Sequence, residues 1–173
     1  MQYQIANLIS PEQASLLREL EGTILNSIFL DDAGEFALNV VIDSSNKKLI
    51  IKNIPTVELD GDDYPKLIVE QCTVETKSYK EIIIGKVIKN ILIVRDKATW
   101  YNNNDNWLVH SDIGVRVILE DKELLLIAHD SLAGFIKLIE LKDPILSEDK
   151  VFEEYWSMKT DVLESLKREE ISV

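Results

Sequence analysis

The sequence predicts an α+β fold: a mainly antiparallel β-sheet, folded as a sandwich or half-barrel, with an N-terminal and a C-terminal helix. The main observation is that residues 81–141 have an almost continuous strand pattern, in which branched apolar residues alternate with short polar breaks. An apolar fraction of 46% is enough to fill one substantial core. Helix-start signals precede residue 11 and residue 148. Since no repeat or linker-like segment interrupts the chain, we expect one domain over residues 1–173.

A helix is predicted over residues 11–21. Ser10 is a good N-cap, Pro11 suits the first turn, and Gln13 lies where a capping box closes. An apolar stripe follows, made of Ala14, Leu16, Leu17 and Leu20. Gly22 is expected to end the helix.

Strands are predicted where branched and aromatic residues lie between turn signals. In the first half of the chain these segments are Thr23–Leu30, Phe36–Ile42, Lys48–Ile54 and Leu67–Glu75. Residues 57–63 form an acidic loop between the last two. Neither side of the alternating segment 67–75 is purely apolar, so we expect this strand either to lie at a sheet edge or to be partly exposed.

The second half opens with residues 81–94, which are too many for one ordinary strand. Either Gly85 marks a bulge or Lys89-Asn90 forms a tight turn. Residues 99–107 then predict a hairpin, with an asparagine-rich loop between aromatic residues. The remaining predicted strands are Gly114–Leu119, Glu123–Ala128 and Phe135–Leu141.

A final helix of about 22 residues is predicted to begin near Ser147. On a helical projection its apolar residues cluster on one side, which would pack on the sheet. These residues are Phe152, Tyr155, Trp156, Val162, Leu163 and Leu166.

The net charge of −12 is concentrated at the two ends of the chain. Residues 1–65 carry eleven acids and four bases, residues 66–146 twelve and eleven, and residues 147–173 eight and four. Such a surface repels nucleic acid and anionic membranes but attracts a basic protein. A single cysteine, Cys72, excludes an internal disulfide, and residues 1–10 lack a signal-peptide pattern. We therefore expect an acidic cytoplasmic protein without nucleic-acid or membrane partners.

The residue types that bind metals form one candidate cluster in the sequence. It consists of His110, Asp112, His129 and Asp130, which lie near predicted strand ends. If hairpin pairing brought them together, they would suit a metal-dependent hydrolase. Otherwise they are residues that flank turns. No phosphate-binding glycine motif or nucleophile motif accompanies them, so we expect no enzyme activity and no cofactor.

Two loops are candidates for contact with a partner, because each places large aromatic residues beside carboxylates. Their residues are Asp60, Asp62, Asp63, Tyr64, Trp100, Tyr101, Asp105 and Trp107. The alternative is that the tryptophans belong to the core and the aspartates only solvate turns. A third interpretation is a small-molecule site with Trp100 and Trp107 at the mouth of a cavity.

The middle of the chain resembles small bacterial immunity-type proteins, which protect a cell against toxins delivered by its neighbours. The resemblance covers about a third of the chain and includes the short motifs D-x-G and D-S-x-A-G-F. The segments that carry it are Ile83-Ile84-Gly85 through Arg95-Asp96, Trp100, Ser111-Asp112-Ile113-Gly114-Val115, Leu124–Ile127 and Asp130-Ser131-Leu132-Ala133-Gly134-Phe135. It implies a cytoplasmic inhibitor that binds a cognate, basic protein toxin, often a nuclease. It assigns no contact residues.

Overall fold

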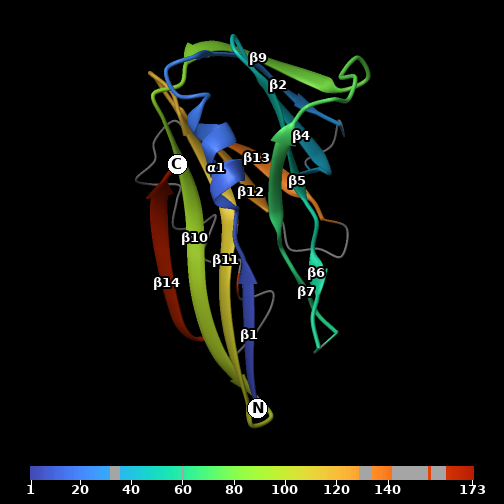
Figure 1. The fold of residues 1–173 in the computed structure, drawn as a ribbon, viewed down its shortest axis with the longest axis vertical. Coiled ribbons are helices and arrows are strands. Elements are labelled where there is room, and N and C mark those ends of the chain that lie inside the picture. The colour runs from blue at the N-terminus through green and yellow to red at the C-terminus, as the bar shows by residue number, and fades with distance from the viewer. Residues whose placement is uncertain (32–35, 60, 129–133, 142–155, 157–162) are drawn as a thin grey trace.

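The computed structural model describes residues 1–31, 36–59, 61–128, 134–141, 156 and 163–173. Within these residues the chain forms two large β-sheets whose facing sides share one core, and a third sheet of two short strands (Figure 1). In spatial order, the strands of the larger sheet are β14 (Leu163–Ser172), β10 (Asn90–Asn102), β11 (Asp105–Ile118), β12 (Glu123–Ala128), β13 (Ile136–Leu141) and β3 (Phe36–Ala37). A further strand, β1 (Gln2–Asn7), also pairs with β11.

The smaller sheet has the order β8 (Leu67–Gln71), β5 (Lys48–Asn53), β4 (Asn39–Ser44), β2 (Ile24–Leu30) and β9 (Lys80–Val87). A separate short hairpin joins β6 (Thr56–Val57) and β7 (Asp63–Tyr64). The described strand pairs are antiparallel, apart from the parallel pair β1 and β11. The predicted mainly antiparallel β-sheet is thus confirmed, and β8 lies at a sheet edge as its mixed alternation indicated.

The core between the two sheets is aliphatic. It combines fully buried residues of the smaller sheet, such as Ile28 and Leu49, with Val115, Leu126 and other residues of the larger sheet. Leu17 of the short helix α1 (Pro11–Arg18) and Leu20 of the turn that follows it belong to the same core. Burying side chains of this size stabilises the fold by about 1.5–3 kcal/mol each.

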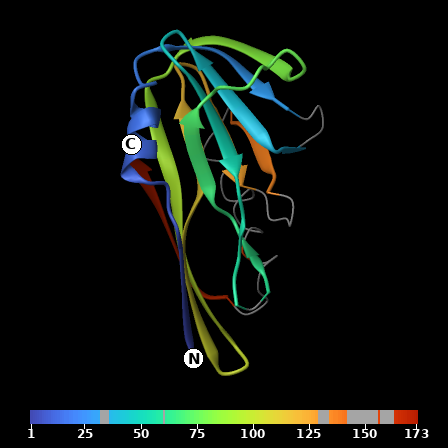
Figure 2. The same cartoon turned by 45° about the vertical axis from the view of Figure 1, so that its right-hand side comes forward.

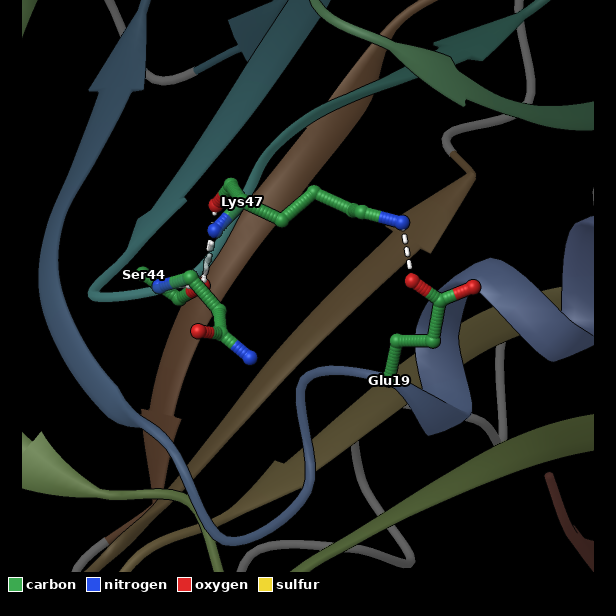
Figure 3. A network of polar contacts seen from close by, with 4 residues as sticks. Glu19, Ser44 and Lys47 are labelled. Carbon is green, nitrogen blue, oxygen red and sulfur yellow. Dashed lines mark hydrogen bonds and ion pairs between the residues drawn. The ribbon is translucent and has the colours of Figure 1, made fainter.

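Helix α1 begins at the residue that the sequence predicts, because Ser10 Oγ accepts a hydrogen bond from the backbone N–H of Gln13 (3.2 Å). Its C-cap, Glu19, forms an ion pair with Lys47 in the turn between β4 and β5 (Figure 3). Ser44 Oγ accepts a hydrogen bond from the Lys47 backbone N–H (3.0 Å) and so holds this turn. The contact ties the helix to the smaller sheet.

The prediction of a helix at each end of the chain is wrong. The first element is strand β1, and α1 follows it and ends three residues earlier than expected. At the other end, residues 163–172 form edge strand β14, which pairs antiparallel with β10. Residues 147–155 and 157–162 of the predicted C-terminal helix lie outside the described part of the chain.

A buried ion pair explains why β14 is a strand although Leu, Lys, Arg and Glu favour helices. Arg168 lies opposite Asp96 of β10 and donates to it through Nε (2.7 Å) and Nη2 (2.6 Å). The indole Nε1 of Trp156 donates to the same carboxylate (2.7 Å). Asp96 is fully buried, so its charge needs all three donors. Tertiary contacts therefore outweigh local propensity in this segment.

Two other segments also differ from the sequence prediction. Residues 36–42 were expected to form one strand, but β3 pairs in the larger sheet and β4 in the smaller one, so the chain changes sheets at Leu38. In residues 81–94, the bulge at Gly85 is found, whereas Lys89-Asn90 does not join a hairpin, because β9 and β10 pair in different sheets. The strand breaks between Val87 and Asn90, and Gly85 (φ +65°) lies in a register shift between β2 and β9.

Strands β10 and β11 form a long hairpin that runs beyond the sandwich (Figure 2). Its turn places Asn103 and Asn104 at positive φ, +47° and +71°, as a two-residue hairpin loop requires. Along β11, residues 106–111 pair with β1 and residues 114–118 pair with β12. Within the described part of the chain, no helix is both long and apolar enough to cross a membrane.

Candidate functional site

The two loops predicted to contact a partner lie on two hairpins that project from the sandwich, β6–β7 and the end of β10–β11 (Figures 1 and 2). In the β6–β7 hairpin, Gly61 has φ +79°, a left-handed conformation that favours glycine. The Gly61 N–H donates to the carbonyl of Glu58 (2.9 Å), and the Glu58 N–H donates to the carbonyl of Asp62 (3.0 Å). These bonds fix the shape of the hairpin loop.

The structure brings the aromatic residues of both loops together in one stack, which we call the aromatic ladder. Trp100 and Trp107 are directly opposite each other on β10 and β11, with ring centroids 6.0 Å apart. Tyr64 of β7 lies 6.3 Å from Trp100 and 6.5 Å from Trp107. Tyr3 of β1 stacks on Trp107 at 4.2 Å, and Trp156 packs against Trp100 at 6.2 Å.

The ladder serves the fold, because Tyr64, Trp100 and Trp107 are buried. They are therefore not an exposed contact surface, and the alternative that the tryptophans belong to a core is correct. Trp107 also borders a shallow pocket of about 250 Å³, which Trp100 does not line. The other residues lining this pocket are Gln2, Thr99, Tyr101, Asn106, Leu108 and Glu164. This pocket therefore does not have both tryptophans at its mouth.

The predicted carboxylates have different environments. Asp62 is partly exposed, and its Oδ1 accepts the backbone N–H of Asp63 (3.0 Å). Asp63 is buried. Asp105 forms an ion pair with the amino group of Met1 (2.7 Å), and Asp60 lies outside the described residues.

The most exposed apolar side chains of the β6–β7 hairpin belong to residues that the sequence analysis did not select. Val57 is 71% exposed and Leu59 is 88% exposed, on either side of Glu58. On the other hairpin, Tyr101 is 48% exposed. The alternation of apolar and acidic residues in Val57-Glu58-Leu59 was a usable signal, because an apolar residue in a short acidic loop has no core to enter.

Of the four residues in the predicted metal cluster, the structure describes His110 and Asp112. His129 and Asp130 lie outside the described residues. Asp112 is fully buried and accepts hydrogen bonds from the Ile9 backbone N–H (2.7 Å) and from Arg95 Nε (2.6 Å) and Nη2 (3.0 Å). The bond to Asp112 raises the pKa of Arg95. Within the described residues, no three His, Cys, Asp or Glu side chains form a group that would hold a metal.

Comparisons with protein-family models, with curated proteins and with solved structures give no match to this chain.

Proposed function

We propose that this protein binds a basic protein toxin and neutralises it, as an immunity-type protein does. The observation that carries the proposal is the β6–β7 hairpin, which projects from the sandwich and exposes Val57 and Leu59 beside the carboxylates of Glu58 and Asp62. Exposed apolar residues rimmed by charge are typical of protein interaction sites. The net charge of −12 favours a basic partner.

Apolar and acidic residues have separate roles in this proposal. Val57 and Leu59 enter a pocket on the partner, and each contributes up to about 1.5–3 kcal/mol when it is buried. Glu58 and Asp62 remain at the rim, where they accelerate the encounter with a positive surface and fix the orientation of the complex. Affinity therefore depends mainly on the apolar pair, and the association rate depends mainly on the acids.

The assignment of the partner as a toxin comes from the resemblance of residues 83–135 to immunity-type proteins. A basic nuclease carries a cationic groove that binds phosphate groups. An acidic hairpin that occupies this groove would exclude the substrate without any chemical step. Inhibition would then be stoichiometric and would weaken at high salt.

The proposal is tested with the product of the gene immediately upstream. We expect this product to be toxic alone, to be tolerated on co-expression with this chain, and to form a one-to-one complex in isothermal titration calorimetry. The double variant Val57→Ser/Leu59→Ser should raise the Kd about 100-fold, because two apolar contacts are lost.

Ile83→Ser is the matched control, because Ile83 is 79% exposed but lies on β9 in the smaller sheet. It should leave the Kd within about twofold of the wild-type value. A complex that forms without loss of toxicity would contradict the proposal. So would an equal loss of affinity in Ile83→Ser and in the double variant.

A further inference from the structure

A row of basic residues crosses the solvent-exposed face of β14, β10 and β11, opposite the aromatic ladder. Lys97 of β10 is paired with Lys167 of β14 on one side and with His110 of β11 on the other. Residues paired across strands point to the same face of a sheet, with Cβ atoms about 5 Å apart. Like charges directly opposite each other repel, so Lys97 and Lys167 would be favoured by an anion that lies over both of them.

The carboxylates near this row are already engaged. Arg95 and Asp112 are the neighbouring pair on β10 and β11. Asp112 is fully buried and accepts two hydrogen bonds from Arg95. Glu169 binds Lys167 (2.5 Å), and this contact, with smaller contributions from His110 and Arg95, lowers the pKa of Glu169. No hydrogen bond or ion pair is found for Lys97 or His110 within the described part of the chain.

The row lines a pocket of about 200 Å³ whose described walls are Arg95, Lys97, His110, Lys167 and Glu169. Three of these five side chains carry a permanent positive charge, although the whole chain has a net charge of −12. With Glu169 included, three positive charges and one negative charge leave the described lining at a net +2, opposite in sign to the chain as a whole. Lysine ammonium groups are donors that bind phosphate as point charges, and an imidazole donates at least one N–H when neutral.

We propose that this pocket binds a small phosphate-bearing anion, held by Lys97, Lys167 and His110. A dianion offsets the repulsion between Lys97 and Lys167. It also accepts hydrogen bonds from Lys97 and His110, which have no such bond within the described part of the chain. The size of the pocket limits the ligand, since about 300–1,000 Å³ is usual for larger small molecules. The acidic remainder of the surface excludes a nucleic-acid polyanion and leaves free phosphate compounds as ligands. The site is separate from the β6–β7 hairpin and does not depend on the proposed function.

The test is isothermal titration calorimetry with inorganic pyrophosphate at low salt and neutral pH. We expect saturable one-site binding to the wild-type protein and a Kd about tenfold higher for Lys97→Gln, because one charged hydrogen bond is lost. Lys89→Gln is the matched control, because Lys89 is exposed and lies between β9 and β10, outside the pocket. Its Kd should stay within about twofold of the wild-type value.

Thermal unfolding gives a second readout that a merely structural lysine would not produce. In phosphate-free buffer, Lys97→Gln should have a higher Tm than the wild type, because repulsion with Lys167 is removed. With excess pyrophosphate the order should reverse, because only the wild type gains the full binding energy. The proposal would be overturned if the wild-type protein did not bind pyrophosphate. It would also be overturned if Lys97→Gln and Lys89→Gln lost affinity for pyrophosphate equally.

Discussion

The two halves of the larger sheet are covered in different ways. Where this sheet faces the smaller one, the described core contains only aliphatic residues, such as Ile93 and Val115. Where β10, β11 and β1 run beyond the smaller sheet, large rings cover one face and charged residues occupy the other. A sheet with a partner layer is covered by interdigitating aliphatic side chains. A sheet without one needs larger side chains to exclude water.

The projecting half also fixes its strand register by charge. Asp96 pairs with Arg168 of β14, and Asp112 pairs with Arg95 of β10, on opposite faces of the sheet. A slip of one residue would move every side chain to the other face and leave two buried carboxylates without their arginines. In the sandwich half, the described core residues are all apolar, so packing sets the register of that core, while the buried Arg116 of β11 forms ion pairs with the more exposed Glu123 and Glu170.

The largest effect is expected from Asp96→Ala in the projecting half. Arg168 and Trp156 would lose their shared acceptor, and the partly buried guanidinium of Arg168 would lose its partner on β10. We expect the free energy of unfolding, measured with urea, to fall by about 3–5 kcal/mol. The free energy of unfolding should fall less in the variant Asp96→Asn, because the side-chain oxygen of asparagine can still accept a hydrogen bond from the Trp156 indole N–H.

The double variant Asp96→Leu/Arg168→Met is the control for this prediction. It removes both charges and replaces them with apolar groups of similar volume, so it should be more stable than Asp96→Ala. If Asp96→Ala cost less than about 1 kcal/mol, the ion pair would not hold β14 and the comparison between the two halves would fail.

The same difference explains which features the sequence predicts. Strands β2, β5, β12 and β13 were located correctly because their branched apolar residues lie between turn signals. Strand β14 was missed because Leu, Lys, Arg and Glu favour a helix, whereas the contacts that select the strand are long-range, among them the pairs of Arg168 with Asp96 and of Glu170 with Arg116. Strand β1 was missed because its pairing with β11 lies about 100 residues away in sequence and leaves no local pattern.

The candidate site was predicted only in part, for the same reason. The sequence identified Tyr64, Trp100 and Trp107, but it does not say which side of a strand faces solvent. Their burial follows from the stacking of three separate segments of the chain. The basic row was missed because Lys97, His110 and Lys167 are neighbours only after β10, β11 and β14 pair. Their spacing in sequence forms no motif.

A smaller effect is expected from Ile28→Val in the sandwich half. Ile28 is fully buried between the sheets, and removal of one methylene should lower the free energy of unfolding by about 1 kcal/mol. Ile83→Val is the control and should leave stability unchanged, because Ile83 is largely exposed. If Ile28→Val lowered the free energy of unfolding as much as Asp96→Ala, the sandwich half and the projecting half would not differ in their sensitivity to the loss of single side chains.

The smallest effect on stability is expected from Glu169→Gln. The pKa of Glu169 is lowered by its contact with Lys167, so this pair stabilises the fold above the unfolded-state pKa of glutamate, about 4.3. That contribution disappears as the pH falls through the lower folded-state value. Both side chains are exposed, so the Tm of Glu169→Gln should lie close to the wild-type Tm at neutral pH and coincide with it at about pH 3.

Glu169→Gln has the opposite consequence for the anion pocket. It removes the only described carboxylate lining the pocket while leaving Lys97, His110 and Lys167 in place. Pyrophosphate should therefore bind more tightly to Glu169→Gln than to the wild type, and the difference should shrink as salt is added. Weaker binding to this variant would show that the lysines need Glu169 to hold them in position, and the row would then be a structural feature of the projecting half.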